Sequence, residues 1–134
     1  MNINKETQSL NMPWEKSYGY AQAVKVGDTI YLAGQVSHDA EGNIIGVGDM
    51  EKQMRQAYAN VAEVLARYGA TMDNIVDEVL FVTDMEAAFT AALNCRHEVF
   101  SGVPVVASTI VQIGRLAFPE FLIEIKCIAR IPSA

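Results

Sequence analysis

The sequence has few cysteines and no excess of positive charge. Cys95 and Cys127 are the two cysteines among 134 residues, too few for a disulfide framework. Lysine and arginine number 10 against 16 aspartates and glutamates, which gives a net charge of −6. Such a chain lacks the basic surface by which proteins bind phosphate backbones, so we expect no nucleic-acid partner.

Long apolar runs and metal-binding motifs are also missing. No run approaches the roughly 20 residues that span a bilayer, and the opening MNINKETQSL lacks the apolar core of a signal peptide. We therefore expect no membrane partner, reduced thiols and a cytoplasmic location. The two histidines and two cysteines stand at no ligand spacing, and no glycine-rich phosphate loop occurs. We expect neither a metal nor an organic cofactor.

What the sequence does contain is typical of a folded domain. Hydrophobic residues make up 51% of the chain and charged residues 19%, which excludes disorder. Because no linker, repeat or low-complexity tract interrupts the chain, we expect residues 1–134 to form one domain. The first dozen residues are polar, and we expect them to be loose or bound at a sheet edge.

The spacing of apolar residues predicts five strands and two helices in the order β-β-α-β-α-β-β. Helices that cross between strands and stack on one sheet face give a two-layer α+β domain with a mixed sheet. In chain order, we predict a hairpin over 23–36 that turns at Gly27-Asp28, a helix from the N-cap Asp49 to a stop at Gly69, a strand over 74–83, a helix over about 86–100, and strands over about 105–113 and 120–131.

The last predicted strand has one apolar face and one mixed face. The residues of the apolar face are Phe121, Ile123, Ile125, Cys127 and Ala129, which we expect to lie under the helices. The opposite face alternates apolar and charged groups, among them Glu124 and Lys126. Such a face suits an oligomer interface with sites embedded in it, or an ordinary antiparallel sheet that is partly wet.

Four stretches carry a resemblance to a known family: GDTIYLAGQV at 27–36, QMRQAYANVAEVLARYGAT at 53–71, NIVDEVLFVTDM at 74–85 and FLIEIKCIAR at 121–130. In order and spacing the chain resembles the YjgF/RidA family, also called endoribonuclease L-PSP-like, from about Tyr20 to Arg130. The resemblance implies a chorismate-mutase-like fold and homotrimers whose sheets form a central barrel. It also implies small-molecule ligands in clefts between subunits. The best-known members hydrolyse enamines and imines such as 2-aminoacrylate without a cofactor.

The resemblance places two candidate catalytic residues in the cleft. Glu124, in the run IEIK, matches a glutamate that activates water or relays a proton, although Lys126 stands where a second acid is usual. The alternative role for Glu124 is structural, as a partner of Lys126 or of a backbone donor. Tyr20 matches a cleft tyrosine that positions the substrate, and otherwise is an interface aromatic. Ala33 and Gly34 match the strand segment that contacts the ligand through its backbone.

One departure from the family concerns the substrate carboxylate. Deaminating members grip it with an arginine, and the matching position here is Ser108, two residues before the further candidate contact Ile110. Arg96 is the candidate replacement cation, or else an arginine whose stem packs and whose head reaches solvent. A cleft position on the same helix falls on Leu93 or Asn94. The resemblance therefore implies a branch of the family that lacks the cleft arginine.

Two functions follow as hypotheses. The first is a cofactor-independent imine or enamine deaminase with a substrate unlike 2-aminoacrylate. The second is a non-catalytic homotrimer that binds a small molecule. A ribonuclease, which the older family name suggests, is disfavoured by the net charge of −6 and by the lack of a catalytic histidine and lysine pattern.

Overall fold

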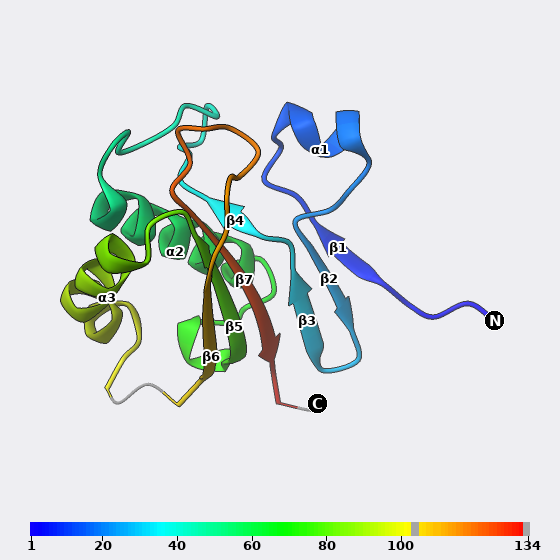
Figure 1. Ribbon diagram of the computed structural model, residues 1–134. Helices are drawn as coiled ribbons and strands as arrows, with labels where there is room; N and C mark the ends of the chain where they lie inside the picture. The colour runs from blue at the N-terminus through cyan, green and yellow to red at the C-terminus, as the bar shows by residue number, and fades with distance from the viewer. Residues whose placement is uncertain (103–104, 133–134) are drawn as a thin grey trace.

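The computed structural model describes residues 1–102 and 105–132. Within them seven strands form one mixed sheet in the order β1-β2-β3-β7-β5-β6, with β4 also pairing β7 (Figure 1). The strands are β1 (Glu6–Gln8), β2 (Ala23–Val26), β3 (Thr29–Leu32), β4 (Gln35–Val36), β5 (Ile75–Val82), β6 (Ala107–Gln112) and β7 (Ile123–Arg130). The helices are α1 (Pro13–Tyr18), α2 (Met50–Ala66), the 3-10 turn η1 (Met72–Asn74) and α3 (Met85–Val99). The predicted α+β class is confirmed.

Both long helices were predicted, and their ends lie close to the predicted ones. Asp49 caps α2 as expected, because its carboxylate accepts a hydrogen bond from the Lys52 backbone nitrogen at 3.1 Å. Gly69, the predicted stop, has a φ of 73° that favours glycine. Asp84 caps α3 in the same way, with the Ala87 nitrogen at 3.1 Å from its carboxylate.

The core lies between the sheet and these helices. α2 packs against α3, β4 and β7, and its apolar stripe from Met54 to Leu65 is buried. The predicted apolar face of the last strand is confirmed: Phe121, Ile123, Ile125, Cys127 and Ala129 are all buried. Burial of this kind supplies most of the stabilising free energy of a domain of this size.

The N-terminal segment was predicted in part. β1 pairs with β2 at the sheet edge, one of the two alternatives expected for the first dozen residues, but α1 follows it where no helix was predicted. Pro13 opens α1 at a position where its missing N–H costs nothing, and the Glu15 carboxylate caps the first turn by accepting from Met12 N. The helix was missed because its six residues carry no apolar periodicity.

The predicted hairpin strand over 29–36 is broken in two. β3 ends at Leu32, and β4 begins at Gln35 and pairs with a different part of β7. Ala33 and Gly34 form the corner between them, and the Cβ of any residue at position 34 would lie 2.5 Å from the Glu124 carboxylate. Pattern alone predicted one strand because both halves are apolar.

The face of the sheet away from α2 and α3 is set by the strand register. Residues directly paired across strands point to the same face. Glu124 pairs with Phe81 and Lys126 with Val79, and these two β5 residues pair in turn with β6. We call this surface of β7, β5 and β6 the open face; among the described residues, the helices cover the other side. None of the described helices is long and apolar enough to cross a membrane.

Candidate functional site

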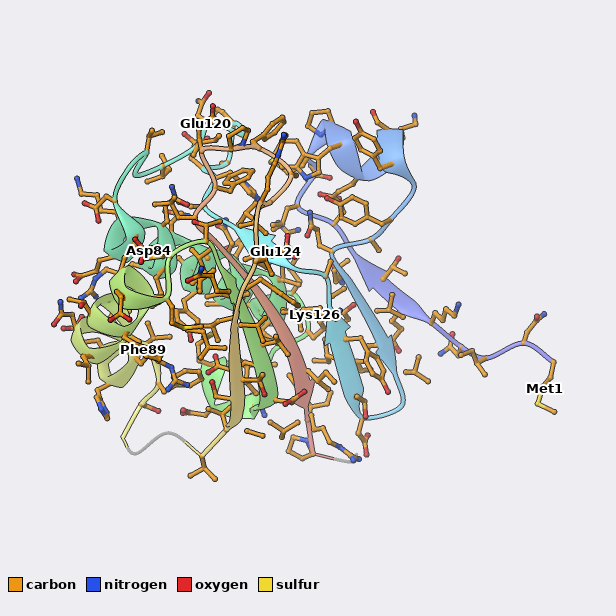
Figure 2. The ribbon with its side chains drawn as sticks, in the orientation of Figure 1. Met1, Asp84, Phe89, Glu120, Glu124 and Lys126 are labelled. Carbon is orange, nitrogen blue, oxygen red and sulfur yellow. The ribbon has the colours of Figure 1, made fainter. Side chains whose placement is uncertain are left out.

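Glu124 lies on the open face of β7 and is half-buried (Figure 2). Among the described residues no donor hydrogen-bonds its carboxylate and no cation lies within 4.0 Å of it. Burial raises the pKa of Glu124, and the positive charge of Lys126 offsets part of that rise. The Lys126 ammonium instead donates to the Leu32 carbonyl at 2.9 Å. The carboxylate is therefore available to water or a ligand.

Ala33 and Gly34 form the wall against which Glu124 lies. A Cβ on Gly34 would stand 2.5 Å from both Cδ and Oε2 of Glu124, so the glycine leaves room for the carboxylate. Ala33 is held by its backbone nitrogen, which donates to the Gln22 carbonyl at 2.8 Å. The corner between β3 and β4 thus brings two predicted ligand contacts together with the predicted catalytic acid.

Tyr20 directly follows α1 and lines a surface hollow of about 470 Å³ together with Glu15 and Ala21. Its side chain is 42% exposed, and its backbone nitrogen donates to the Glu15 carbonyl at 3.0 Å. Burial, followed by the negative charges of Glu15 and Glu124, raises the pKa of Tyr20, whereas hydrogen bonds with Gln22 and Trp14 lower it. The Glu124 charge is thus a smaller influence on the Tyr20 phenol than burial and the charge of Glu15.

Ser108 and Ile110 lie on the other side of the sheet. Ser108 pairs with Glu78 and Ile110 with Leu80, and both of these β5 residues are buried on the helix side. Because β6 is an edge strand, Ser108 is nevertheless exposed. The chain therefore does not bring Ser108 and Ile110 onto the face that carries Glu124.

The three α3 candidates have separate environments. Leu93 is 79% exposed and lines a surface hollow of about 370 Å³ with Phe89, Ala92, Arg96 and His97. The Asn94 amide donates to Glu51 at 2.8 Å, which holds it on the α2 side of the helix. Leu93 is therefore the more accessible of the two alternatives.

The Arg96 head pairs with a buried acid, although the side chain is 24% exposed. Its guanidinium pairs with the fully buried carboxylate of Glu78 and donates to the Tyr58 hydroxyl at 3.3 Å. It also stacks over Phe100, 5.4 Å from the ring centroid. This ion pair was not predicted from the sequence, and it forms because Glu78 needs a partner on the helix side of β5. A direct role of Arg96 in substrate binding stays a prediction.

Sequence reasoning missed four buried polar residues: Glu15, Gln22 and Gln35 near the Gly34 corner, and Glu78 on the helix side of the sheet. A signal for Glu78 was present, since an acid inside an apolar strand and an arginine on an apolar helix stripe together indicate a buried pair. In residues 1–102 and 105–132, no group of three histidine, cysteine, aspartate or glutamate side chains is arranged to hold a metal ion.

Comparisons with known proteins give a consistent result. The family model described as Endoribonuclease L-PSP matches residues 13–131. The RutC family protein YjgH of Escherichia coli is 37% identical over 114 residues, which cover 85% of this chain and 84% of that protein. A 2-iminobutanoate/2-iminopropanoate deaminase of Dermatophagoides farinae is 31% identical over 97 residues, 72% of this chain and 74% of that protein. The solved structure of protein YJGH has a TM-score of 0.79 at 31% identity and covers 100% of this chain and 98% of that one.

Proposed function

Because the chain belongs to the YjgF/RidA (endoribonuclease L-PSP) family, we propose that it is a cofactor-independent deaminase that hydrolyses an imine or enamine. The observation that carries the proposal is the Glu124 carboxylate. It is half-buried, free of ion-pair and hydrogen-bond partners among the described residues, and close against the Gly34 corner. A relative with 31% identity that is named an imine deaminase supports the reaction class.

The proposed reaction needs one residue that accepts and returns a proton. Glu124 takes a proton from water while the water oxygen bonds to the imine carbon and the imine nitrogen takes up a proton from solvent. In the resulting carbinolamine Glu124 returns its proton to the nitrogen, the C–N bond breaks and ammonia leaves, while the hydroxyl releases its proton to solvent to give the carbonyl. An enamine first becomes an imine, as its carbon gains a proton from solvent and its nitrogen releases one. Water and one carboxylate suffice for these steps, so no metal or organic cofactor takes part.

Two other groups orient the substrate in this proposal. The Tyr20 hydroxyl lies in the field of Glu124 and binds the substrate or the attacking water. The backbone beside Ala33 and Gly34 contacts a polar end of the ligand. Ser108, Ile110 and Leu93 come from the opposite side of the sheet, so they reach the same ligand only from a second copy of the chain. We therefore propose intersubunit clefts in a homotrimer.

The proposed substrate is not a small 2-imino acid. At position 108 serine offers one hydroxyl where a bidentate guanidinium would contribute on the order of 1.5–3 kcal/mol per charged hydrogen bond. Arg96 is already paired with Glu78 and is held on the helix side of β5. Loss of two such bonds weakens 2-aminoacrylate binding by several orders of magnitude, so a different imine or enamine is the substrate.

Ammonia release over a panel of enzymatically generated imines and enamines tests the proposal. We expect turnover of at least one member, little turnover of 2-aminoacrylate, and a loss of about 10²–10⁴-fold in kcat for Glu124→Gln. Glu120→Gln is the matched control, because Glu120 is an exposed glutamate in the loop before β7. Binding without turnover by the wild type would favour the alternative, a non-catalytic small-molecule-binding trimer, and full activity of Glu124→Gln would overturn the proposed mechanism.

A further inference from the structure

Glu15 is a buried carboxylate with an unusually complete set of donors. It accepts hydrogen bonds from the backbone nitrogens of Leu10 at 3.1 Å and Met12 at 3.0 Å, and from the Gln22 side-chain amide at 3.1 Å. Burial by itself would raise the pKa of Glu15, but hydrogen bonds from these groups and from Ser9 outweigh it and hold the pKa below its usual range. Glu15 is therefore a fixed negative charge inside the fold.

The hydrogen-bond network continues from Glu15 through two glutamines. Gln35 donates its side-chain amide to the Gln22 side-chain carbonyl at 2.7 Å and to the Ala33 backbone carbonyl at 3.2 Å. Glu15, Gln22 and Gln35 are 7%, 2% and 1% exposed. Their side chains link α1 and the segment that follows it, before β2, to the more distant β4. We call these three residues the buried polar chain.

The same three segments carry one half of the proposed site. Tyr20 directly follows α1, and its backbone nitrogen donates to the Glu15 carbonyl. Gly34 lies between Ala33 and Gln35, and the hydrogen bond from the Gln35 side-chain amide to the Ala33 carbonyl spans it. The buried polar chain thus links the backbone next to Tyr20 with the Gly34 corner, against which Glu124 lies.

A contribution to stability alone does not explain why these three polar residues are buried here. Its three polar side chains lose hydration on burial, and apolar residues of similar volume are often at least as stabilising. Moreover, the Gln35 side-chain oxygen is buried without a hydrogen-bond partner among the described residues. Directional hydrogen bonds nevertheless fix distance and angle in a way that apolar packing does not.

We propose that Glu15 is a positioning residue: acting through Gln22 and Gln35, it fixes Tyr20 and the Gly34 corner relative to Glu124. Only one consequence of this proposal, the expected fall in kcat, rests on the proposed function. Glu15 contacts no substrate in this account. Its role is to hold a phenol and a backbone wall at the separation that the acid requires, where displacements well below 1 Å already matter.

Two variants interrupt the buried polar chain at different points. Glu15→Gln removes the charge and weakens the bonds to the amides. Gln22→Met keeps the backbone capping of α1 by Glu15 but cuts the link to Gln35. If the chain positions the site, both variants lower kcat by about 10-fold or more with a smaller change in KM. Glu41→Gln, an exposed glutamate in the loop after β4, is the matched control and leaves both constants unchanged.

A second readout does not depend on turnover. In protein with ring-labelled tyrosine, Tyr20→Phe identifies the Tyr20 resonance. We expect both variants to shift that resonance, and Glu15→Gln to lower the pKa of Tyr20, because the negative charge of Glu15 raises it. Urea denaturation gives the folded fraction to which kcat is referred. Variants that lose stability but keep the wild-type Tyr20 resonance, and the wild-type kcat per folded molecule, would overturn the proposal. If no imine is turned over at all, the proposed function fails, and the Tyr20 resonance still decides the positioning role.

Discussion

Gly34 and Glu124 illustrate how one hydrogen atom decides access to a carboxylate. A methyl group at position 34 would lie 2.5 Å from Glu124 Cδ, but the atoms it meets are the far end of a flexible side chain. Gly34 has no positive φ, so alanine is compatible with its backbone. In an alanine variant at position 34, the Glu124 side chain is thus the group that moves to relieve the clash.

For Gly34→Ala we therefore predict a displaced carboxylate with little loss of stability. We expect kcat on the accepted imine to fall at least 10-fold, while the free energy of unfolding in urea changes by less than about 1 kcal/mol. Gly48→Ala is a less suitable control because Gly48 has a φ of 78°, so Ala40→Gly in the exposed loop serves instead. Wild-type kcat in Gly34→Ala would mean that Glu124 is not the proton acceptor.

Lys126 tunes Glu124 through its charge. Burial raises the pKa of Glu124 and Lys126 lowers it, so Lys126→Met leaves the rise unopposed. Glu124 acts as a base only when ionised, so activity appears as pH rises through its pKa. We predict that the acid limb of kcat/KM against pH moves to higher pH in Lys126→Met, with the plateau reached later.

The control for this pH shift is Lys25→Met. Lys25 pairs with Glu6 at 3.2 Å on the edge strands β1 and β2 and should leave the pH profile unchanged. A shift of the acid limb to lower pH in Lys126→Met would contradict the sign of the argument and would indicate that a different group carries the proton.

At the scale of elements, Glu78 on β5 and Arg96 on α3 form a buried polar link between the sheet and its helices. Glu78 is fully buried, and Arg96 and Tyr58 are its partners. Removing Arg96 leaves a buried charge with one hydroxyl donor, 2.8 Å away on Tyr58. We predict that Arg96→Met lowers the free energy of unfolding by about 3 kcal/mol, measured in urea.

Two further variants distinguish a buried charge from simple packing. Arg96→Met combined with Glu78→Gln removes the charge and keeps an acceptor for Tyr58, so it should recover most of the loss. Arg67→Met removes the exposed pair with Glu63, 3.6 Å apart, and should cost no more than about 1 kcal/mol. An equal loss in all three variants would show that the Glu78 charge is not the cause.

The sequence predicted the elements whose periodicity is long, namely α2, α3, β5 and β7. It did not predict α1, because the six residues of that helix are held by the buried carboxylate of Glu15 and not by a repeating apolar face. It also predicted one continuous strand where β3 and β4 are separate. The corner at Gly34 lies against the Glu124 side chain, which is 90 residues away in the sequence. A pattern within one segment carries no information about contacts between distant segments.

The candidate site was predictable in part. Resemblance placed Glu124, Tyr20, Ala33 and Gly34 together; the fold brings Glu124 against the Ala33-Gly34 corner, and the place of Tyr20 in the site stays a prediction. It could not tell that Arg96 meets Glu78, because that pairing requires the register of α3 on β5. The buried polar chain was also missed, since glutamine in a short segment carries no distinctive signal.

At the scale of the whole molecule, the two groups of candidate residues lie on opposite sides of one sheet. Glu124 lies on the open face, and Ser108 lies on the helix side of the edge strand β6. One small molecule cannot touch both residues of a single chain. Apolar side chains are exposed on the same side of the sheet as Glu124, Val111 on the open face and Tyr31 on β3, and a second copy would cover them.

Mixed oligomers test this arrangement directly. Glu124→Gln disables one half of the proposed cleft, and Ser108→Trp blocks the other half at an exposed position where a large side chain is tolerated in the isolated chain. If each cleft takes its halves from two chains, co-refolding the two inactive variants in equal amounts restores about one quarter of the wild-type sites by random assortment.

Mixing Glu124→Gln with an inactive Tyr20 variant is the matched control, because both changes lie in the same half and every mixed cleft keeps at least one of them. Light scattering reports the oligomer in each mixture. A monomer, or oligomers of Glu124→Gln and Ser108→Trp without regained ammonia release, would show that the cleft does not form between chains.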